Sequence, residues 1–232
     1  MRSRPARGTG PGAGAGALDR DRIVAALLRL LDADGVDRFS MRRLAADLNV
    51  TPMSLYWYVD NKDDLLELAL DAVAGEIELP DPAAGHDWRD DLRLLATAWR
   101  RVMVAHPWAL RCYGEYLNIG PQSVRFARCA RAVIARSPLP PTRWSTALSA
   151  VFQYVYGFTV MESRWIEGGR AIGRTADEFF SEVADSVTGV PGVEAAGGLL
   201  EQRGGLTLAQ IRDQDFHRTL DWLIAGMTAA PS

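Results

Sequence analysis

The stretch SMRRLAADLNVTPMSLYWYVDNKDDLL, residues 40–66, decides the fold of this chain. Ser40 is a suitable N-cap, and the apolar residues after it recur at the spacing that lines one helical face. Asn49 stands where this helix should end, because asparagine tolerates the left-handed conformation of a tight turn. Thr51 suits the N-cap of a second helix, and Pro52 its first position, where no hydrogen bond is lost. The stretch predicts two short helices joined by a tight turn.

The second predicted helix has two unlike faces. Leu55 and Val59 lie four residues apart and are expected to point into the core. The opposite face carries hydrogen-bonding and aromatic side chains, namely Met53, Ser54, Trp57 and Tyr58, with Tyr56 at its margin. A core helix would not be so polar and aromatic on that face, so the pattern favours contact with a partner. A helix-turn-helix that places its second helix in a DNA major groove has this organisation.

Residues 39–66, and LYWYVDNKDDLL above all, resemble the DNA-binding domain of TetR-type bacterial transcriptional regulators. Farther on, HPWAL at residues 106–110 and DFHRTLDWLIAGM, ending at Met227, are similar to the C-terminal domain of the tetracycline-repressor-like branch. The resemblance implies an all-α fold with an N-terminal three-helix helix-turn-helix domain and a larger helical ligand-binding and dimerisation domain. We expect these domains at residues 18–79 and 87–232, after a disordered basic tail at residues 1–17.

The resemblance also implies DNA-contacting residues. Arg42 matches a family arginine that reaches DNA, through a guanine or a phosphate. The N-terminal end of the reading helix, where base edges are usually met, comprises Thr51, Pro52, Met53 and Ser54. Tyr56, Tyr58 and Lys62 match positions that mostly contact the backbone or the groove wall. Pro52, Met53 and Tyr58 depart from the tetracycline-repressor pattern, so the operator sequence is not carried over.

The charge distribution agrees with a protein that contacts DNA at one end. The net charge of −3 argues against a protein that coats nucleic acid along its whole surface. Residues 1–62 hold ten Arg/Lys against seven Asp/Glu, or +3, which leaves −6 for the remainder. Arg2, Arg4 and Arg7 in the tail either form an arm that adds DNA contacts or belong to a solvated tail.

Cysteine usage and hydropathy indicate a cytoplasmic protein without a membrane partner. The two cysteines, Cys112 and Cys129, imply no disulfide framework and favour a reducing compartment. No signal peptide is visible, and no apolar run approaches the length of a membrane span. Asp60, Asp63 and Asp64 resemble a metal cluster, but capping of the helix that begins near Asn61 explains them more simply.

Two helices of the second domain are candidates for a homodimer interface. The helix expected from Pro141 to Glu167 is apolar on more than one face, which indicates burial on more than one side. The helix expected from Asp213 to Met227 carries apolar residues at four- and three-residue steps, a pattern typical of helix-on-helix packing. By resemblance, the two build a four-helix dimer interface, with ordinary core packing as the alternative. A symmetric dimer would present two reading helices to a palindromic operator.

A small hydrophobic effector is expected to bind aromatic side chains of the second domain that have a few polar neighbours. The candidates are Trp99, His106, Trp108, Tyr113, Tyr116, Phe126, Phe152, Tyr156 and Met161. For each of them taken alone, a position in the core is the commoner case. The histidines are scattered without ligand spacing, so we expect neither a metal nor a cofactor.

The sequence thus predicts a ligand-responsive dimeric DNA-binding regulator: a repressor that a small hydrophobic molecule releases from double-stranded DNA. One alternative is a DNA-binding regulator without an effector. Another is a helical enzyme with a DNA-binding-like module, although no nucleophile elbow, P-loop, paired catalytic carboxylates or metal motif supports catalysis.

Overall fold

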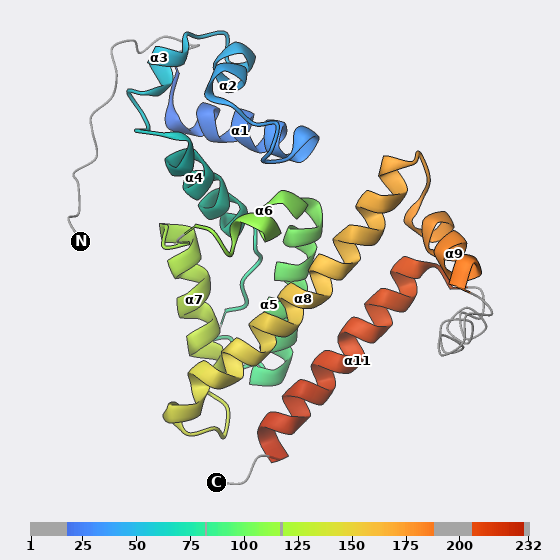
Figure 1. Ribbon diagram of the computed structural model, residues 1–232. Coiled ribbons are helices and arrows are strands. Elements are labelled where there is room, and N and C mark those ends of the chain that lie inside the picture. The colour runs from blue at the N-terminus through green and yellow to red at the C-terminus, as the bar shows by residue number, and fades with distance from the viewer. Residues whose placement is uncertain (1–17, 82, 117, 188–205, 230–232) are drawn as a thin grey trace. The chain divides into compact units, whose positions relative to one another are not determined.

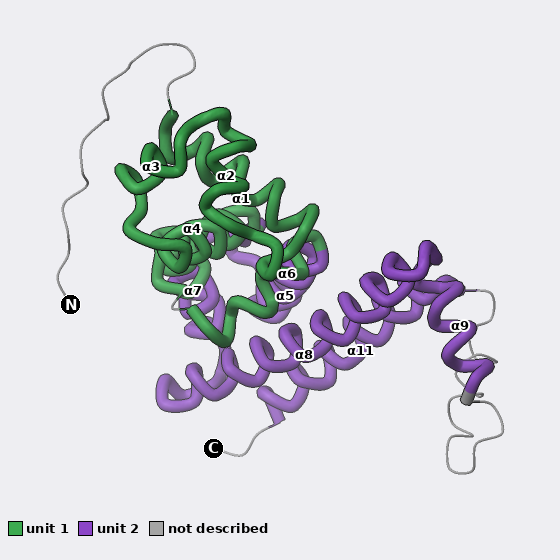
Figure 2. The backbone as a smooth tube through the Cα atoms, turned by 45° about the horizontal axis from the view of Figure 1, so that its top comes forward, with its two compact units in different colours: residues 1–77, 105–127 green, residues 78–104, 128–232 purple. Residues whose placement is uncertain are grey.

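The computed structural model describes residues 18–81, 83–116, 118–187 and 206–229, and the tail predicted at residues 1–17 lies outside them. The fold is all-α, as predicted, with no strand among the described residues (Figure 1). None of the described helices combines the length and the apolar character needed to cross a bilayer. The chain divides into two compact units, residues 1–77 with 105–127 and residues 78–104 with 128–232 (Figure 2).

Unit 1 contains α1 (Arg20–Asp34), α2 (Met41–Asp47), α3 (Pro52–Leu55), α4 (Lys62–Gly75) and α6 (Pro107–Cys112). The first seven residues of α7 (Pro121–Ile134) also belong to it. Its core is aliphatic, and the fully buried side chains include Ile23, Leu27, Leu31, Leu44, Leu55, Leu65, Leu66 and Leu70. This core fixes α2 and α3 against α1 and α4.

Local capping chemistry sets most of the helix ends in unit 1. Ser40 accepts a hydrogen bond from the Arg43 amide, and Asn61 accepts one from the Asp64 amide. Asn49 has a φ of 55°, so the predicted left-handed turn after α2 is confirmed. Thr51 is the N-cap residue of α3 and Pro52 its first residue, as predicted, but the Thr51 side chain makes no capping bond; its hydroxyl lies 3.0 Å from the Ser54 hydroxyl.

Unit 2 contains α5 (Trp88–Ala105, apart from its last residue), α8 (Trp144–Ala171), α9 (Ala176–Val187) and α11 (Leu208–Ala229). A short 3-10 turn, η1 (Pro141–Arg143), precedes α8. Figures 1 and 2 both show α8 and α11 side by side and antiparallel, with α9 at the far end of the pair. Phe216, Leu220 and Ile224 form the buried row of α11.

Capping boxes begin α9 and α11. Thr175 and Glu178 exchange amide hydrogen bonds of 2.8 and 3.2 Å, which form a capping box. Thr207 and Gln210 form a second box with bonds of 2.9 and 3.2 Å. The sequence reasoning overlooked this second box, so it expected the last helix to begin at Asp213 instead of Leu208.

The two units differ from the expected domains at residues 105–127. The sequence reasoning assigned this segment to the second domain, whereas its contacts group it with α1–α4. Where the folding domains end remains a prediction.

Candidate DNA-binding and ligand-binding residues

α3 and the turn after it expose large apolar and aromatic side chains to solvent. Leu55 and Val59 point inward as predicted, with 0% and 6% of their surface exposed. Met53 is 70% exposed, Trp57 76% and Tyr56 45%. Buried anchors and exposed apolar or aromatic groups therefore lie on opposite sides of α3 and the turn after it, as predicted, although the helix ends at Leu55 and does not extend to Val59 as expected.

Arg42 stands out among the arginines of α2. Its side chain is exposed, and the described part of the chain offers it no hydrogen bond or ion pair. Its neighbour Arg43 is paired with Asp34 at 2.6 Å. Thr51 and Pro52 are also exposed, and Ser54 is half-buried. Arg42 is thus the guanidinium of α2 that is available to a phosphate or a guanine.

Tyr58 and Lys62 are engaged within unit 1. The Tyr58 hydroxyl donates to the Leu18 carbonyl, just before α1. The Lys62 ammonium donates to the Val36 carbonyl at 3.4 Å and lies 5.5 Å from the centre of the Phe39 ring. Both side chains are half-buried. Their predicted DNA contacts remain predictions.

His106 and Trp108 join a polar cluster in unit 1. The His106 ring places Nδ1 2.7 Å from Asp32 Oδ1 and Nε2 3.0 Å from Glu76 Oε2, and the Trp108 indole donates to Asp32 at 2.8 Å. Burial of the His106 ring lowers its pKa, but hydrogen bonds and the charges of the two carboxylates outweigh burial, so the pKa is raised. Only a doubly protonated ring can donate to both carboxylates.

Other residues of 105–127 also contact α4 and the connection between α1 and α2. Asp71 of α4 accepts hydrogen bonds from the amides of Gln122 and Ser123 at 3.0 and 2.9 Å, which caps the start of α7. Arg111 makes a two-pronged ion pair with Asp37 at 2.7 and 3.1 Å. These bonds and the His106 cluster explain why the segment groups with α1–α4.

The nine predicted ligand-binding residues are divided between the two units. His106, Trp108, Tyr113, Tyr116 and Phe126 belong to unit 1, and Trp99, Phe152, Tyr156 and Met161 to unit 2. Trp99 and Phe152 stack, with ring centres 4.4 Å apart. Tyr116 donates to Asp63 at 3.3 Å in unit 1. A common ligand site for all nine residues remains a prediction.

A buried ion pair in unit 2 was not anticipated from the sequence. Arg100 of α5 donates two hydrogen bonds to the Glu162 carboxylate of α8, at 2.8 and 2.7 Å, and a third to Asp213 of α11 at 3.0 Å. The Arg100 guanidinium also lies 4.6 Å from the centre of the Phe216 ring. Burial lowers the Arg100 pKa, yet the two carboxylates raise it overall. Each of these helices carries several charged residues, and sequence spacing does not show which of them face each other.

Comparison with known proteins identifies the family. The family described as "Bacterial regulatory proteins, tetR family" matches residues 23–69, and the one described as "Tetracyclin repressor-like, C-terminal domain" matches residues 79–230. The chain belongs to the TetR family. It is a DNA-binding transcriptional regulator of a family whose members respond to ligands, which agrees with the resemblance of the helix-turn-helix.

Three similar proteins each match three quarters or more of the chain. An HTH-type transcriptional regulator of Saccharopolyspora erythraea is 36% identical over 91% of this chain and 85% of the relative. The HTH-type transcriptional repressor DrrR1 of Streptomyces coeruleorubidus is 32% identical over 76% of this chain and 64% of the relative. The TetR family protein ActR of Streptomyces coelicolor, solved in complex with actinorhodin, has a TM-score of 0.72 and 28% identity over 92% of this chain and 98% of that chain.

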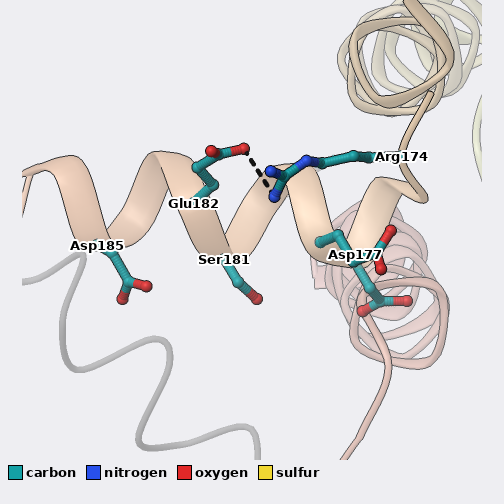
Figure 3. Close-up of a pocket in the computed structure, with 6 residues that line it drawn as sticks. Arg174, Asp177, Ser181, Glu182 and Asp185 are labelled. Carbon is teal, nitrogen blue, oxygen red and sulfur yellow. Dashed lines mark ion pairs between the residues drawn. The ribbon is translucent and has the colours of Figure 1, made fainter. Parts of the chain in front are cut away.

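One further surface feature of this TetR-family chain is an acidic hollow along α9. It is lined by Arg174, Asp177, Glu178, Ser181, Glu182 and Asp185 (Figure 3). Arg174 pairs with Glu182 at 3.3 Å across it. It contains none of the predicted ligand-binding residues. Within the described ranges, no group of three His, Cys, Asp or Glu side chains could hold a metal ion.

Proposed function

We propose that this TetR-family regulator is a dimeric repressor that binds a palindromic operator and is released by a small hydrophobic molecule. The observation that carries the proposal is the exposed face of α3 and the turn after it, where Met53, Tyr56 and Trp57 meet solvent. Beside it, Arg42 of α2 has no hydrogen-bond or ion-pair partner among the described residues. A helix-turn-helix inserts such a face into the major groove. The relative DrrR1 is a transcriptional repressor, which supports repression over activation. A repressor of this kind acts in the cytoplasm, where the DNA lies.

The DNA site is tested on a duplex selected from a random-sequence pool by the full-length protein. The double variant Arg42→Ala/Tyr56→Ala should lose binding to that duplex by at least about 100-fold, because a base or phosphate contact each contributes about 1–3 kcal/mol. The matched control, Arg101→Ala/Tyr113→Ala, removes the same residue types away from α2 and α3. Gel-shift titration measures affinity, and circular dichroism measures folding. Undiminished binding by a folded double variant would refute the assignment.

The proposed dimer uses α8 and α11, whose outward faces combine apolar and small residues. Trp222 is 67% exposed on α11, and Met161 is 48% exposed on α8. Gly157 of α8 and Gly226 of α11 have no atom within 4 Å of the position that a Cβ would take. Exposed apolar side chains beside open glycine positions suit the close approach of a second helix pair. The dimer would space two reading helices about 34–36 Å apart.

A large side chain at an open glycine tests this interface. A Cβ at Gly157 would meet no atom within 4 Å beyond the adjacent turns of its own helix, so the Gly157→Arg protomer should fold, whereas a helix packed on α8 would be pushed away. Sedimentation velocity is expected to show a monomer for Gly157→Arg and a dimer for Ala132→Arg, which adds the same charge at an exposed position of α7. A dimer of unchanged stability in Gly157→Arg would place the interface elsewhere.

The proposed effector is a small hydrophobic molecule. The aromatic side chains of unit 2, among them the stacked pair Trp99 and Phe152, support this class. The actinorhodin complex of the Streptomyces coelicolor protein supports it as well. Actinorhodin, tetracycline and a panel of hydrophobic metabolites would be screened by thermal shift, and hits tested for release of the selected duplex. A ligand can move the protein off DNA only by its differential affinity for the two states.

The outcomes separate the effector hypothesis from its alternative. A compound that raises the melting temperature and weakens duplex binding supports a ligand-responsive repressor. Binding to the duplex with no response to any compound favours a regulator without a small-molecule effector. The family and its relatives are regulators, and nothing in the described residues favours catalysis over this function.

A further inference from the structure

We propose that α3 recognises thymine through its C5-methyl group, with the Met53 side chain lying against that methyl in the major groove. The base pair that Met53 meets in each half-site of the operator is then an A·T pair. The inference rests on the proposed function, because it concerns the base pairs of the same operator. It deepens that function by naming the chemical group that the reading helix selects.

The first observation is the absence of charge around the reading helix. Residues 48–59, LNVTPMSLYWYV, contain no Asp, Glu, Lys or Arg. The side chains that usually read a G·C pair are charged, since Arg or Lys binds guanine and Glu or Asp accepts from the cytosine amino group. Arg42 and Arg43 belong to α2 (Figure 1), and the first helix of a helix-turn-helix crosses the DNA backbone. Lys62, after the stretch, donates to a backbone carbonyl of unit 1. α3 itself therefore has no charged group with which to read G·C.

The second observation concerns the two hydroxyl groups of this face. Thr51 Oγ1 and Ser54 Oγ lie 3.0 Å apart and form a hydrogen bond with each other. Ser54 is also half-buried. A base contact through either hydroxyl would have to share or break this bond. The hydroxyls that flank Met53 are thus partly satisfied within unit 1.

The third observation is that carbon dominates what lies between these hydroxyls. Pro52 and Met53 are both exposed, and 70% of the Met53 surface meets solvent. The proline ring has neither donor nor acceptor, and methionine has only a thioether sulfur, which is a weak acceptor. Methionine is unbranched and polarizable, so its side chain adapts to the shape of an apolar group. The two residues form an apolar surface on a helix that enters the major groove.

Thymine matches this surface because its major-groove edge carries an apolar group, the C5-methyl. Contact between that methyl and Met53 removes the apolar surface of both from water, which is favourable. Against a G·C pair, Met53 would cover polar base atoms without offering them hydrogen bonds, and a polar group that loses water without gaining a partner is costly. The Met53 side chain therefore favours thymine and also disfavours G·C, so both terms contribute to specificity.

Deoxyuridine substitution tests the proposal, because uracil pairs as thymine does and lacks only the methyl group. In the duplex selected by the full-length protein, each thymine of the half-site is replaced in turn, symmetrically in both half-sites. At the position that faces Met53, affinity should fall about fourfold per half-site, the factor that one buried methyl group contributes, or about 15-fold for both. Gel-shift titration measures the affinity. Replacement of thymines outside the half-sites is the control and should change nothing.

The variant Met53→Ala connects the loss to this side chain. Met53 is exposed, so the variant should fold, and circular dichroism checks that it does. It should bind the thymine duplex more weakly than the wild type, and its response to deoxyuridine at the same position should fall below about twofold. The control variant Leu94→Ala truncates a 39% exposed side chain of α5 and should keep the full wild-type response.

A second probe separates the methyl group from the rest of the base. Cytosine placed at the same position should weaken binding by the wild type. 5-Methylcytosine restores the methyl and keeps the cytosine amino group, so it should recover about fourfold per half-site relative to cytosine. Met53→Ala should not distinguish cytosine from 5-methylcytosine.

The outcomes separate this inference from the proposed function. If no thymine of the selected half-site responds to deoxyuridine, or if Met53→Ala responds as strongly as the wild type, the inference is overturned and the proposed function stands. If the wild type selects no duplex at all, the proposed function fails and the inference fails with it. Loss of the response in Met53→Ala, with Leu94→Ala unchanged, supports thymine recognition by Met53.

Discussion

Replacing His106 should weaken unit 1 in a pH-dependent manner. The His106 ring connects the end of α1 to the end of α4 through Asp32 and Glu76, at 2.7 and 3.0 Å. His106→Leu removes the charge and both donors but preserves most of the volume. Asp32 then keeps the Trp108 indole as a donor at 2.8 Å, and Glu76 loses the donor that His106 provided.

The size of the effect follows from burial. The His106 side chain is 11% exposed, but those of Asp32 and Glu76 are 35% and 47% exposed, so water partly replaces the missing bonds. Two fully buried charged hydrogen bonds would contribute about 3–6 kcal/mol, and this exposure reduces the expected loss to about 1–2 kcal/mol. For a chain of this length, that lowers the melting temperature by about 2–8 °C.

The sign of the pH dependence follows from the direction of the pKa shift. The pKa of His106 is raised in the folded protein above its ordinary value of 6.5. Its stabilisation is therefore fully present below about pH 6.5 and is lost as the pH rises through the raised folded-state pKa. The melting temperatures of wild type and His106→Leu should differ most near about pH 6 and converge near about pH 9.

Melting followed by circular dichroism tests this, with His217→Leu as the control. His217 is 42% exposed and lies 3.7 Å from Asp213, so its replacement should change little. A difference between wild type and His106→Leu that is the same at both pH values, or below about 0.5 kcal/mol at the lower one, would refute the reasoning.

Three further predictions concern the other buried polar groups. Asp71→Ala should cost about 1–3 kcal/mol in urea unfolding, because it removes the cap of α7, and Asp71→Asn should cost less because it keeps an acceptor. Glu162→Leu should cost about 3 kcal/mol, since it strands the buried Arg100 charge; a loss below about 0.5 kcal/mol would show that Asp213 suffices as a partner. Burial raises the pKa of Cys112 to about 11, so a disulfide reagent at about pH 8 should modify Cys129 first; faster modification of Cys112 would show that its burial is transient.

The helix-turn-helix was predictable because its signals are local. A cap bonds to residues three positions away, and Asn49 needs only its own backbone angle to end α2. The inward positions of Leu55 and Val59 follow from helical spacing alone. Local reasoning located the N-cap at Thr51 but not the partner of its hydroxyl, which is Ser54. It also missed the Thr207 box, which starts the last helix at Leu208 instead of Asp213.

Tertiary structure alone decided which partners the polar side chains find. His106 meets carboxylates 74 and 30 residues away, and Asp71 caps a helix that begins 50 residues later. The same is true of Tyr58, whose partner Leu18 is 40 residues away, and of Arg100 with Glu162, 62 residues apart. The sequence by itself determined the helix-turn-helix, the caps at Ser40 and Asn61 and the outward face of α3, because each depends on neighbours within a turn or two. The assignment of residues 105–127 to the DNA-reading unit depends on long-range hydrogen bonds, whose pairing no periodicity along the chain encodes.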